Sequence, residues 1–595
     1  MIATPIDQRE PPASEQHAAS QSAAAASPGP WLEPAARQDA VRDCLFLGLV
    51  VLLSLALYVH RLGFYGDDWA FLGMYATTAD QSFLGLFRSV YLPDYPPFHD
   101  DRMRPVQILY LTGLYWLFGL QPLGYHLVNA GMLVAMTVLF YLALRELGQP
   151  RLLTLTVPLM YALLPHYSTD RFWYVSFHGV FSLVGYFMSL YADLRVLRAR
   201  RSRVWGWKVL SLTALLASVL TYEVALPLFL VNPLVVWLRA RQVHGPARGW
   251  RLLRPDWGVV FGSNALTLTL AIVFKGLNLS HTGGAKLGGQ DGYLQHVTGL
   301  VRHSLDVSFD DYGIRFPGVV WRIVDRYPDG AVLTVGAALG LIVFGYLYAA
   351  AGRQQAALGA RGMWFGHGVA GLVVFGLGYA IFLTNYHVQF TTSGIGNRVA
   401  IAAAIGVAMS FVGGVGWACG FVPPGRLRRT AFSLLIAVLC AGSAVTVNTL
   451  ASFWAAAYVE QRVILAGLRE RVPALPAGAM LILDGTCPYA GPAMVFESSW
   501  DLAGALMVLY RDPTLRADVV ASHLQVGEQG LSTLHYGWIE RHYPYGEHLL
   551  IYHAGQRIVR QLSDAEAARR YFQTAAVSGI RDCPTGSPGL GVPVF

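Results

Sequence analysis

The sequence predicts a polytopic α-helical membrane protein with a small soluble α/β domain at its C-terminus. Of its 595 residues, 54% are hydrophobic and only 13% are charged, whereas soluble domains carry about 25% charged residues. Apolar runs long enough to span a bilayer recur between residues 44 and 449, and strand-like and amphipathic patterns follow them. The formal net charge is +8. The basic residues lie in short loops, which indicates membrane topology and excludes a nucleic-acid surface with interleaved aromatics.

The N-terminal region predicts a cytoplasmic tail and a signal anchor. Residues 1–40 are rich in Ala, Ser, Gln and Pro and have no apolar periodicity, so we expect them to be disordered. The first apolar run, residues 44–60, has no small-residue cleavage site after it. Arg37 and Arg42 precede this run, which places the N-terminus in the cytoplasm and the following loop outside.

An acidic pair, Asp67-Asp68, lies in the external loop 61–104 just after the first span. One interpretation is an Asp N-cap that opens a short helix over residues 69–75. The other is a functional pair, since one ionised acid raises the pKa of its neighbour and two acids can bind a cation or supply a base. Residues 82–91 of the same loop predict a short amphipathic helix on the membrane surface.

Residues 41–450 predict about 11 to 13 spans. The apolar runs are residues 44–60, 105–119, 125–144, 152–165, 174–194, 208–238 (two spans), 257–275, 331–351, 364–384, 397–421 and 431–449. Four basic clusters are expected on the cytoplasmic side. They are Arg195, Arg198, Arg200, Arg201, Arg203 with Lys208; Arg239, Arg241, Arg248, Arg251, Arg254; Arg353 with Arg361; and Arg426, Arg428, Arg429.

This topology works downstream of residue 239 and conflicts upstream. Downstream, it places loops 276–330 and 385–396 outside, together with everything after residue 450. The long loop 276–330 is expected to be ordered over a site. Upstream, an external Asp67 and a cytoplasmic cluster at 195–208 require an odd number of crossings, and four apolar runs lie between them. One run must re-enter the membrane or be misassigned, and the short, Pro-flanked run 152–165 is the first candidate.

Residues 451–595 predict an extracytoplasmic α/β domain. Residues 480–485 (MLILDG) have the pattern of a buried strand that ends in a turn. Helical patterns occupy residues 459–468, 502–510 and 564–571. Cys487 and Cys583 form a disulfide in an oxidising compartment or are two unrelated buried thiols. The five cysteines have no CxxC spacing and so offer no zinc or redox motif.

Four stretches carry a resemblance to a known family. They are Asp67-Asp68 after the first span; Arg104-Pro105, followed by Phe118-Gly119 and residues 124–129 (GYHLVN); Pro165-His166 with Trp173 and His178; and residues 220–227 (LTYEVALP). In this order and spacing, over roughly the first 240 residues, the chain resembles the GT-C-fold membrane glycosyltransferases, such as protein O-mannosyltransferases and aminoarabinose transferases, which use polyprenyl-phosphate sugars. Tyr222 departs from the pattern, which has a Lys there, so any phosphate contact by that cation is in doubt.

The resemblance implies an enzyme that moves a hexose or pentose from a polyprenyl-phosphate donor, with inversion, to a glycan, lipid or protein. By this resemblance Asp67 would be the base and Asp68 its neighbour. Independently of the resemblance, the charge that develops on a leaving lipid phosphate needs a cation near the membrane surface, for which Arg398 is the first candidate and Arg104 the second. Glu223, His126 and His166 would line the site.

Several of these residues also have simpler interpretations. Arg398 could snorkel to the interface, and Arg104 could pair with Asp100 or Asp101. His126 and Asn129, three residues apart, could bond between spans, which we favour. His166, Asp170 and Arg171 read as exposed loop residues. No cofactor is expected, and Asp310-Asp311 alone offer too few oxygens for a divalent cation.

Two other functions fit the sequence less well. A transporter or flippase of lipid-linked sugars would show inverted repeats and interrupted helices at mid-membrane, which the sequence lacks. A non-catalytic membrane scaffold would leave Glu223 unexplained, since a carboxylate in an apolar run is costly. The Gly- and Ala-rich composition points to a bacterial inner or plasma membrane, with the site and the C-terminal domain on its extracytoplasmic side.

Overall fold

The computed structural model describes residues 34–92, 102–244, 255–278, 290–385, 388–521, 524–535 and 539–574. Most of the predicted tail lies outside these residues, as do Asp100, Asp101 and Cys583. The chain divides into two units, residues 1–46 and residues 47–595. Helix α2 (Pro34–Leu55) begins in the first unit, inside the predicted tail, and ends in the second. All that follows concerns the second unit.

The second unit is rich in helices. They are α3 (Asp67–Thr77), α4 (Phe83–Tyr91), α5 (Pro105–Phe118), α6 (Pro122–Glu146), α7 (Arg151–Leu163), α8 (Thr169–Phe172), α9 (Phe177–Val196), α10 (Arg201–Thr221), α11 (Leu226–His244), α12 (Pro255–Asn278), α13 (Gln290–Leu305), α14 (Phe316–Arg326), α15 (Gly330–Gly352), α16 (Gln355–Gly359), α17 (Arg361–Tyr379), α18 (Ala403–Cys419), α19 (Arg426–Arg471), α20 (Ser499–Tyr510) and α21 (Ala565–Thr574). Short turns of other helix types include η3 (Pro165–Tyr167), η4 (Glu223–Ala225), the π-helix η6 (Asp306–Ile314), η7 (Ala380–Thr384) and η8 (Ile395–Ala400).

Six helices of the described chain are long and apolar enough to cross a membrane. They are Pro122–Glu146, Arg201–Thr221, Glu223–Val243, Gly330–Gly352, Arg361–Leu383 and Arg426–Arg471. In α15 and α17, only 28% of the apolar window is buried inside the protein, which is little compared with a helix in a soluble core. An exposed apolar helix surface of this kind needs lipid or protein to cover it, so these helices indicate a membrane protein.

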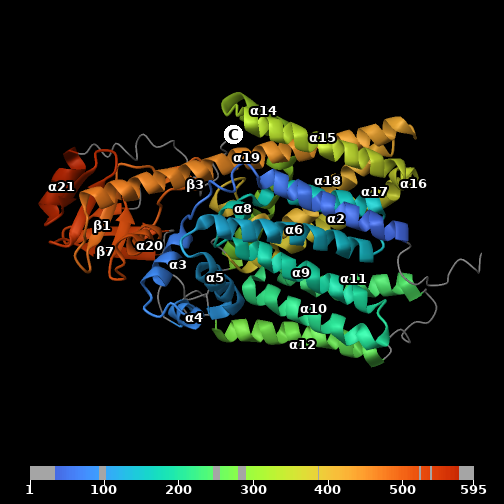
Figure 1. The fold of residues 1–595 in the computed structure, drawn as a ribbon, viewed down its shortest axis with the longest axis horizontal. Coiled ribbons are helices and arrows are strands. Elements are labelled where there is room, and N and C mark those ends of the chain that lie inside the picture. Colours follow the sequence, from blue (N-terminus) through green and yellow to red (C-terminus); the bar gives the residue numbers. More distant parts are fainter. Residues whose placement is uncertain are drawn as a thin grey trace, which may run out of the picture. The chain divides into compact units, whose positions relative to one another are not determined.

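The helices form a bundle with two chemically different ends (Figure 1). At one end, which we call the arginine end, Arg195 binds Glu146 at 3.0 Å and Arg239 Nε donates to the Glu146 carbonyl at 2.8 Å. The start of α7 joins the same end, because the Leu152 amide donates to Gln354 Oε1 at 3.2 Å. Described members of the predicted basic clusters therefore gather at one end, while Arg248, Arg251 and Arg254 lie outside the described residues. Lys208 does not join them, since it is buried inside α10 and pairs with Asp193 at 2.9 Å.

The opposite end, the site end, holds Asp67, Asp170, Glu223 and Arg398. Helix α7 runs from the arginine end to the site end. Helix α5 instead has both of its termini at the site end: Arg104 before it binds Glu223, and the carbonyl of Gly119 after it accepts from Tyr125, whose ring packs on Phe64. Three helices, α6, α7 and α9, thus connect Asp67 with the 195–208 cluster. Of the four apolar runs, 105–119 is thus the one that begins and ends at the same end of the bundle, a course that we expect of 152–165.

The C-terminal domain is of the α/β type. Its main sheet has the order β4-β1-β8-β9, in which β1 pairs in parallel with β4 and β8, and β9 is antiparallel to β8. The strands are β1 (Met480–Asp484), β2 (Tyr489–Ala490), β3 (Ala493–Met494), β4 (Arg516–Val519), β5 (Leu524–Val526), β6 (Gly530–His535), β7 (Ile539–Pro544), β8 (Leu549–His553) and β9 (Ile558–Gln561). Strand β1 confirms the predicted strand, and Gly485 turns the chain after it with φ +71°.

Helix α19 joins the bundle to this domain without a break. It continues across residue 450, where we had expected a domain boundary, because no proline interrupts its 46 residues. One apolar core includes Trp454 of α19, Phe71 of α3, Leu481 of β1 and Leu502 of α20. The domain therefore packs on the site end of the bundle. In Figure 1, α19 extends from beside α15 to the red and orange strands.

Candidate functional site

The acidic pair lies in the first turn of α3. Its N-cap is Gly66, with φ +50°, so neither Asp caps the helix in the predicted way. Asp68 is fully buried and accepts hydrogen bonds from the backbone amides of Tyr65 and Val175, both at 2.8 Å. Burial raises the pKa of Asp68 well above its ordinary value. Asp68 thus ties the loop before α3 to the loop before α9, and no substrate can reach it without displacing these amides.

Asp67 is the member of the pair that a substrate can reach, because it is only half-buried. Its Oδ1 accepts a hydrogen bond from Trp500 Nε1 at 2.7 Å. Burial raises the pKa of Asp67, while the positive charge of Arg398 and the Trp500 bond act in the opposite direction. The side chain therefore combines access, a raised pKa and a nearby cation.

Arg398 reaches this site from η8. Its guanidinium lies 4.6 Å from the centre of the Trp173 ring, and Trp173 is fixed by its own bond to the Tyr65 carbonyl at 2.8 Å. Neighbouring Asn397 anchors η8, because its Oδ1 accepts from Ser168 and its amide donates to Pro165 and Thr392. Among the described residues, the guanidinium makes no hydrogen bond or ion pair. Its charge is left to act on Asp67 and Asp170 and is available to an anion.

The segment between α7 and α9 is buried, contrary to the expected exposed loop. His166 is 0% exposed, Asp170 2% and Arg171 3%. The polar residues of this segment predict exposure, but it packs against η8 and most of its polar groups bond internally. Among the described residues, His166 Nδ1, Asp170 Oδ2 and Arg171 Nε have no hydrogen-bond partner. Asp170 Oδ1 accepts from Ser176 at 2.6 Å, and burial raises the pKa of Asp170 to about 8. Burial lowers the pKa of His166 to about 4, and its Nε2 contacts the Ser308 carbonyl.

Glu223 is the centre of a second cluster of charged side chains at the same end. Arg104 binds it through two nitrogens, at 3.2 and 3.0 Å, and Lys275 Nζ lies 2.5 Å from Oε1. Arg104 also lies 5.0 Å from the Tyr222 ring centre. The pairing of Arg104 with Asp100 or Asp101 falls outside the described residues. The charges of Arg104 and Arg398 both act on Tyr222.

His126 lies deeper, between helices. Its Nε2 contacts the Gly63 carbonyl at 3.0 Å, and Asn129 donates to the Asp170 carbonyl at 3.1 Å. These bonds between elements are the simpler interpretation that we favoured. His126 Nδ1, Asn129 Oδ1 and Arg171 Nε have no partner and belong to residues that line one small cavity, which suits a buried water. His126 and His166 therefore support the site from behind, whereas Glu223 faces the cations.

No metal centre emerges from the described part of the chain, which contains no group of three or more His, Cys, Asp or Glu side chains placed to hold an ion. Asp310 and Asp311 instead face Arg315, at 2.9 and 3.9 Å. Cys487 is disulfide-bonded, whereas Cys419 and Cys440 are free thiols.

Three site residues escaped the sequence reasoning. Lys275 ends an apolar helix and puts an ammonium beside Glu223, and this charge at a helix end is a signal that could have found it. Asp170 belongs to a polar segment that the sequence predicts to be an exposed loop. Trp500 gave no signal, because its partner Asp67 lies 433 residues away.

Neither the protein-family models nor the curated proteins contain a match to this chain. What the structure defines is a helix-rich chain with apolar helices of membrane-spanning length. One end carries a reachable carboxylate, a cation with no acidic partner and a second group of charges, with an α/β domain packed beside them.

Proposed function

We propose that this protein is a membrane glycosyltransferase that moves a sugar from a polyprenyl-phosphate donor to an extracytoplasmic hydroxyl or amine. The observation that carries the proposal is the proximity of Arg398 to Asp67, on whose pKa the Arg398 charge acts. A carboxylate that can take a proton lies beside a guanidinium that can bind a phosphate, and 331 positions of sequence separate them. The sequence resemblance to the GT-C enzymes supports the base, since it includes Asp67-Asp68, whereas Arg398 lies beyond the roughly 240 residues that the resemblance covers.

Each charged group then has a role in the reaction. The acceptor loses its proton to Asp67 as its oxygen or nitrogen attacks the anomeric carbon. The bond from that carbon to the phosphate oxygen breaks on the opposite face, which inverts the configuration, and the bonding electrons stay on the phosphate. Arg398, Arg104 and Lys275 stabilise the negative charge of that leaving group. Glu223 orients Arg104 and Lys275 between turnovers.

The position of the site suits a lipid-linked donor. The site lies at one end of apolar helices, opposite the arginine end. By the positive-inside rule the arginine end faces the cytoplasm, so the site and the α/β domain face the other side. A polyprenyl chain would lie among the apolar helices while its phosphate reaches the cations at the surface. A GT-C-like arrangement with about 11 to 13 spans would fit this placement.

The deciding experiment measures transfer from a panel of radiolabelled polyprenyl-phosphate sugars to a crude cell-envelope acceptor by the purified protein in lipid nanodiscs. We expect transfer by the wild type. Asp67→Asn should lose about 100-fold or more, since a general base contributes about 10²–10⁴ to the rate. Asp325→Asn is the matched control, because it makes the same chemical change at an exposed position of α14, away from the site.

The alternatives predict different results. A transporter or flippase would bind the lipid-linked sugar and release it unchanged, with equal binding by the wild type and Asp67→Asn. A scaffold would bind no donor. Either result, with protein that elutes as a single folded species, contradicts the enzyme.

A further inference from the structure

The C-terminal domain contributes one side chain directly to Asp67. The Trp500 indole N–H donates to Asp67 Oδ1 at 2.7 Å. Within the described residues it is the one hydrogen bond that the Asp67 carboxylate receives from a side chain, and the Oδ2 atom receives none. Since Oδ1 is occupied, Oδ2 is the oxygen left for an acceptor proton.

Trp500 is itself firmly held. It lies in the first turn of α20, where Asp501 accepts from the backbone amides of Glu497, Ser498 and Leu502 at 2.8, 3.1 and 2.6 Å. These bonds fix the start of the helix, because amides in a first turn have no partner within the helix. The backbone that carries the indole is therefore rigid.

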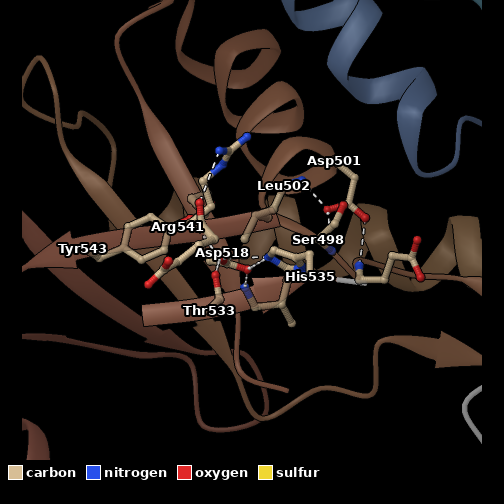
Figure 2. Close-up of polar contacts among 12 residues, drawn as sticks. Ser498, Asp501, Leu502, Asp518, Thr533, His535, Arg541 and Tyr543 are labelled. Atoms are coloured by element: carbon tan, nitrogen blue, oxygen red, sulfur yellow. Dashed lines mark hydrogen bonds and ion pairs between the residues drawn. The ribbon is translucent and has the colours of Figure 1, made fainter. Parts of the chain in front are cut away.

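The ring of Trp500 packs against the ring of His535. The two ring centres are 5.5 Å apart and the planes meet at 62°. His535 Nε2 lies 3.1 Å from both oxygens of Asp518, which is fully buried. Figure 2 shows that Asp518 also accepts hydrogen bonds from the hydroxyls of Thr533 and Tyr543, at 2.7 and 2.8 Å. The buried Asp518 carboxylate thus orients the His535 imidazole that packs against the Trp500 indole.

The helix that carries Trp500 is packed directly on the helix that carries Asp67. A Cβ added to Gly504 of α20 would lie 2.2 Å from the Trp69 carbonyl oxygen, and one added to Gly73 would lie 2.8 Å from Gly504. Only glycines permit this approach of two backbones. The distance between the indole and the carboxylate is therefore set by backbone contact and not by flexible side chains.

We propose that Trp500 is a positioning residue that holds Asp67 in its reactive orientation, so that the C-terminal domain completes the active site. This inference rests on the proposed function, in which Asp67 is the base. It gives the α/β domain a role in catalysis: the bundle alone would carry an Asp67 with no donor to orient it.

The bond has an electrostatic consequence that can be measured. The charged or titratable groups that face Asp67 are Arg398 of η8 and Asp68 of α3, and α20 offers the neutral Trp500. A donor to a carboxylate favours its ionised form. Removal of the indole N–H should therefore raise the pKa of Asp67, and the base form would be lost at a higher pH than in the wild type.

The test compares Trp500→Phe with the wild type. Trp364→Phe is the matched control, because the indole of Trp364 in α17 donates to the Ala357 carbonyl of α16, away from the site. For each protein we would measure kcat/KM against pH. Independently of turnover, we would measure carbodiimide labelling of Asp67 against pH by mass spectrometry, since the reagent modifies protonated carboxyls. Trp500→His, which keeps a ring N–H, tests rescue.

We expect Trp500→Phe to lose about tenfold in kcat/KM near neutral pH and to shift both midpoints upward by about one pH unit. Trp364→Phe should match the wild type, and Trp500→His should recover part of the loss. Unchanged midpoints in a folded Trp500→Phe protein would overturn the inference. If that variant does not fold, Trp500→Leu replaces it. If the wild type transfers no sugar but Trp500→Phe still shifts the labelling midpoint of Asp67, the proposed function is wrong and the positioning contact stands.

Discussion

At the scale of single residues, Asp67 and Asp68 are neighbours with opposite environments. Asp68 is fully buried and bonds two backbone amides, whereas Asp67 is half-buried and faces Arg398 and Trp500. A side chain that holds two loops together and a side chain that can exchange a proton with a substrate are thus adjacent in the sequence. Neither residue is the N-cap of α3 that one interpretation of the pair predicts.

Asp68→Asn should destabilise the protein, while Asp67→Asn should not. The amide nitrogen of Asn cannot accept the backbone N–H that one Asp68 oxygen accepts, so one buried amide loses its partner at a cost of about 1–3 kcal/mol. Asp67 is half-buried with a raised pKa, so a neutral side chain is tolerated there. Thermal unfolding in nanodiscs measures both. Equal melting temperatures for the two variants would contradict the distinction.

Arg398→Gln should weaken binding of the donor phosphate. The guanidinium has no partner in the described chain to replace, so its loss removes charge-assisted hydrogen bonds to phosphate, an effect of about 10- to 100-fold. Without this positive charge the pKa of Asp67 should also rise, which moves the acidic limb of kcat/KM to higher pH. Inhibition of transfer by polyprenyl phosphate measures the first effect.

The control for this variant is Arg315→Gln. Arg315 is exposed and pairs with Asp310, so the same chemical change occurs away from the site. If Arg398→Gln and Arg315→Gln bind polyprenyl phosphate as the wild type does, Arg398 is an interfacial anchor, the simpler role that its sequence position allowed.

At the scale of elements, the contact of α3 with α20 decides whether the domain reaches the site. Strand β1 and helix α20 belong to an α/β domain whose existence was predicted, yet nothing in their sequences indicated where that domain would pack. The close approach of Gly73 and Gly504 determines it. Small residues at a helix interface allow backbones to approach, and any side chain there forces them apart.

Gly504→Ala should separate α20 from α3. The added methyl would overlap the Trp69 carbonyl oxygen at 2.2 Å, and overpacking of this kind costs about 1–3 kcal/mol. Since the same movement withdraws Trp500 from Asp67, activity should fall as well. Gly345→Ala on the exposed face of α15 is the control, where a methyl meets nothing within 4 Å. Thermal unfolding and transfer assays together would show whether the two losses coincide; a Gly504→Ala protein equal to this control would contradict the packing.

At the scale of the whole molecule, the two ends of the bundle differ in charge and in role. The four basic clusters assign one end, and the carboxylates, Arg398 and the α/β domain belong to the other. With α5 confined to the site end, the helices that link Asp67 to the 195–208 cluster are odd in number, as an external site and a cytoplasmic cluster require.

Single cysteines introduced at the two ends of the bundle should be labelled from opposite sides of sealed vesicles. Gln121→Cys, just after α5, and Asp325→Cys on α14 should react with an impermeant maleimide from one side, and Ser202→Cys at the start of α10 from the other. All three positions are exposed. Labelling of Gln121→Cys and Ser202→Cys from the same side would mean that α5 crosses the membrane and that another helix does not.

The sequence by itself determined the features that depend on composition and local pattern. Apolar length predicts the long helices, because the cost of apolar surface in water is independent of the partner that covers it. The strand β1, the short helices α3 and α4 and the placement of basic clusters at one end follow from similarly local rules. The acidic pair and Arg398 stood out because charge beside an apolar run is costly and therefore conspicuous.

Only the tertiary structure decided which of these residues meet. Asp67 contacts Trp500 and faces Arg398, Glu223 gathers Arg104 and Lys275, and Asp170 is buried although its neighbours in sequence are polar. Each of these facts depends on segments hundreds of residues apart being packed to within a few ångströms. Burial, pKa and access are properties of that packing, so the same amino acid, Asp, is a structural tie at position 68 and a reachable acid at position 67.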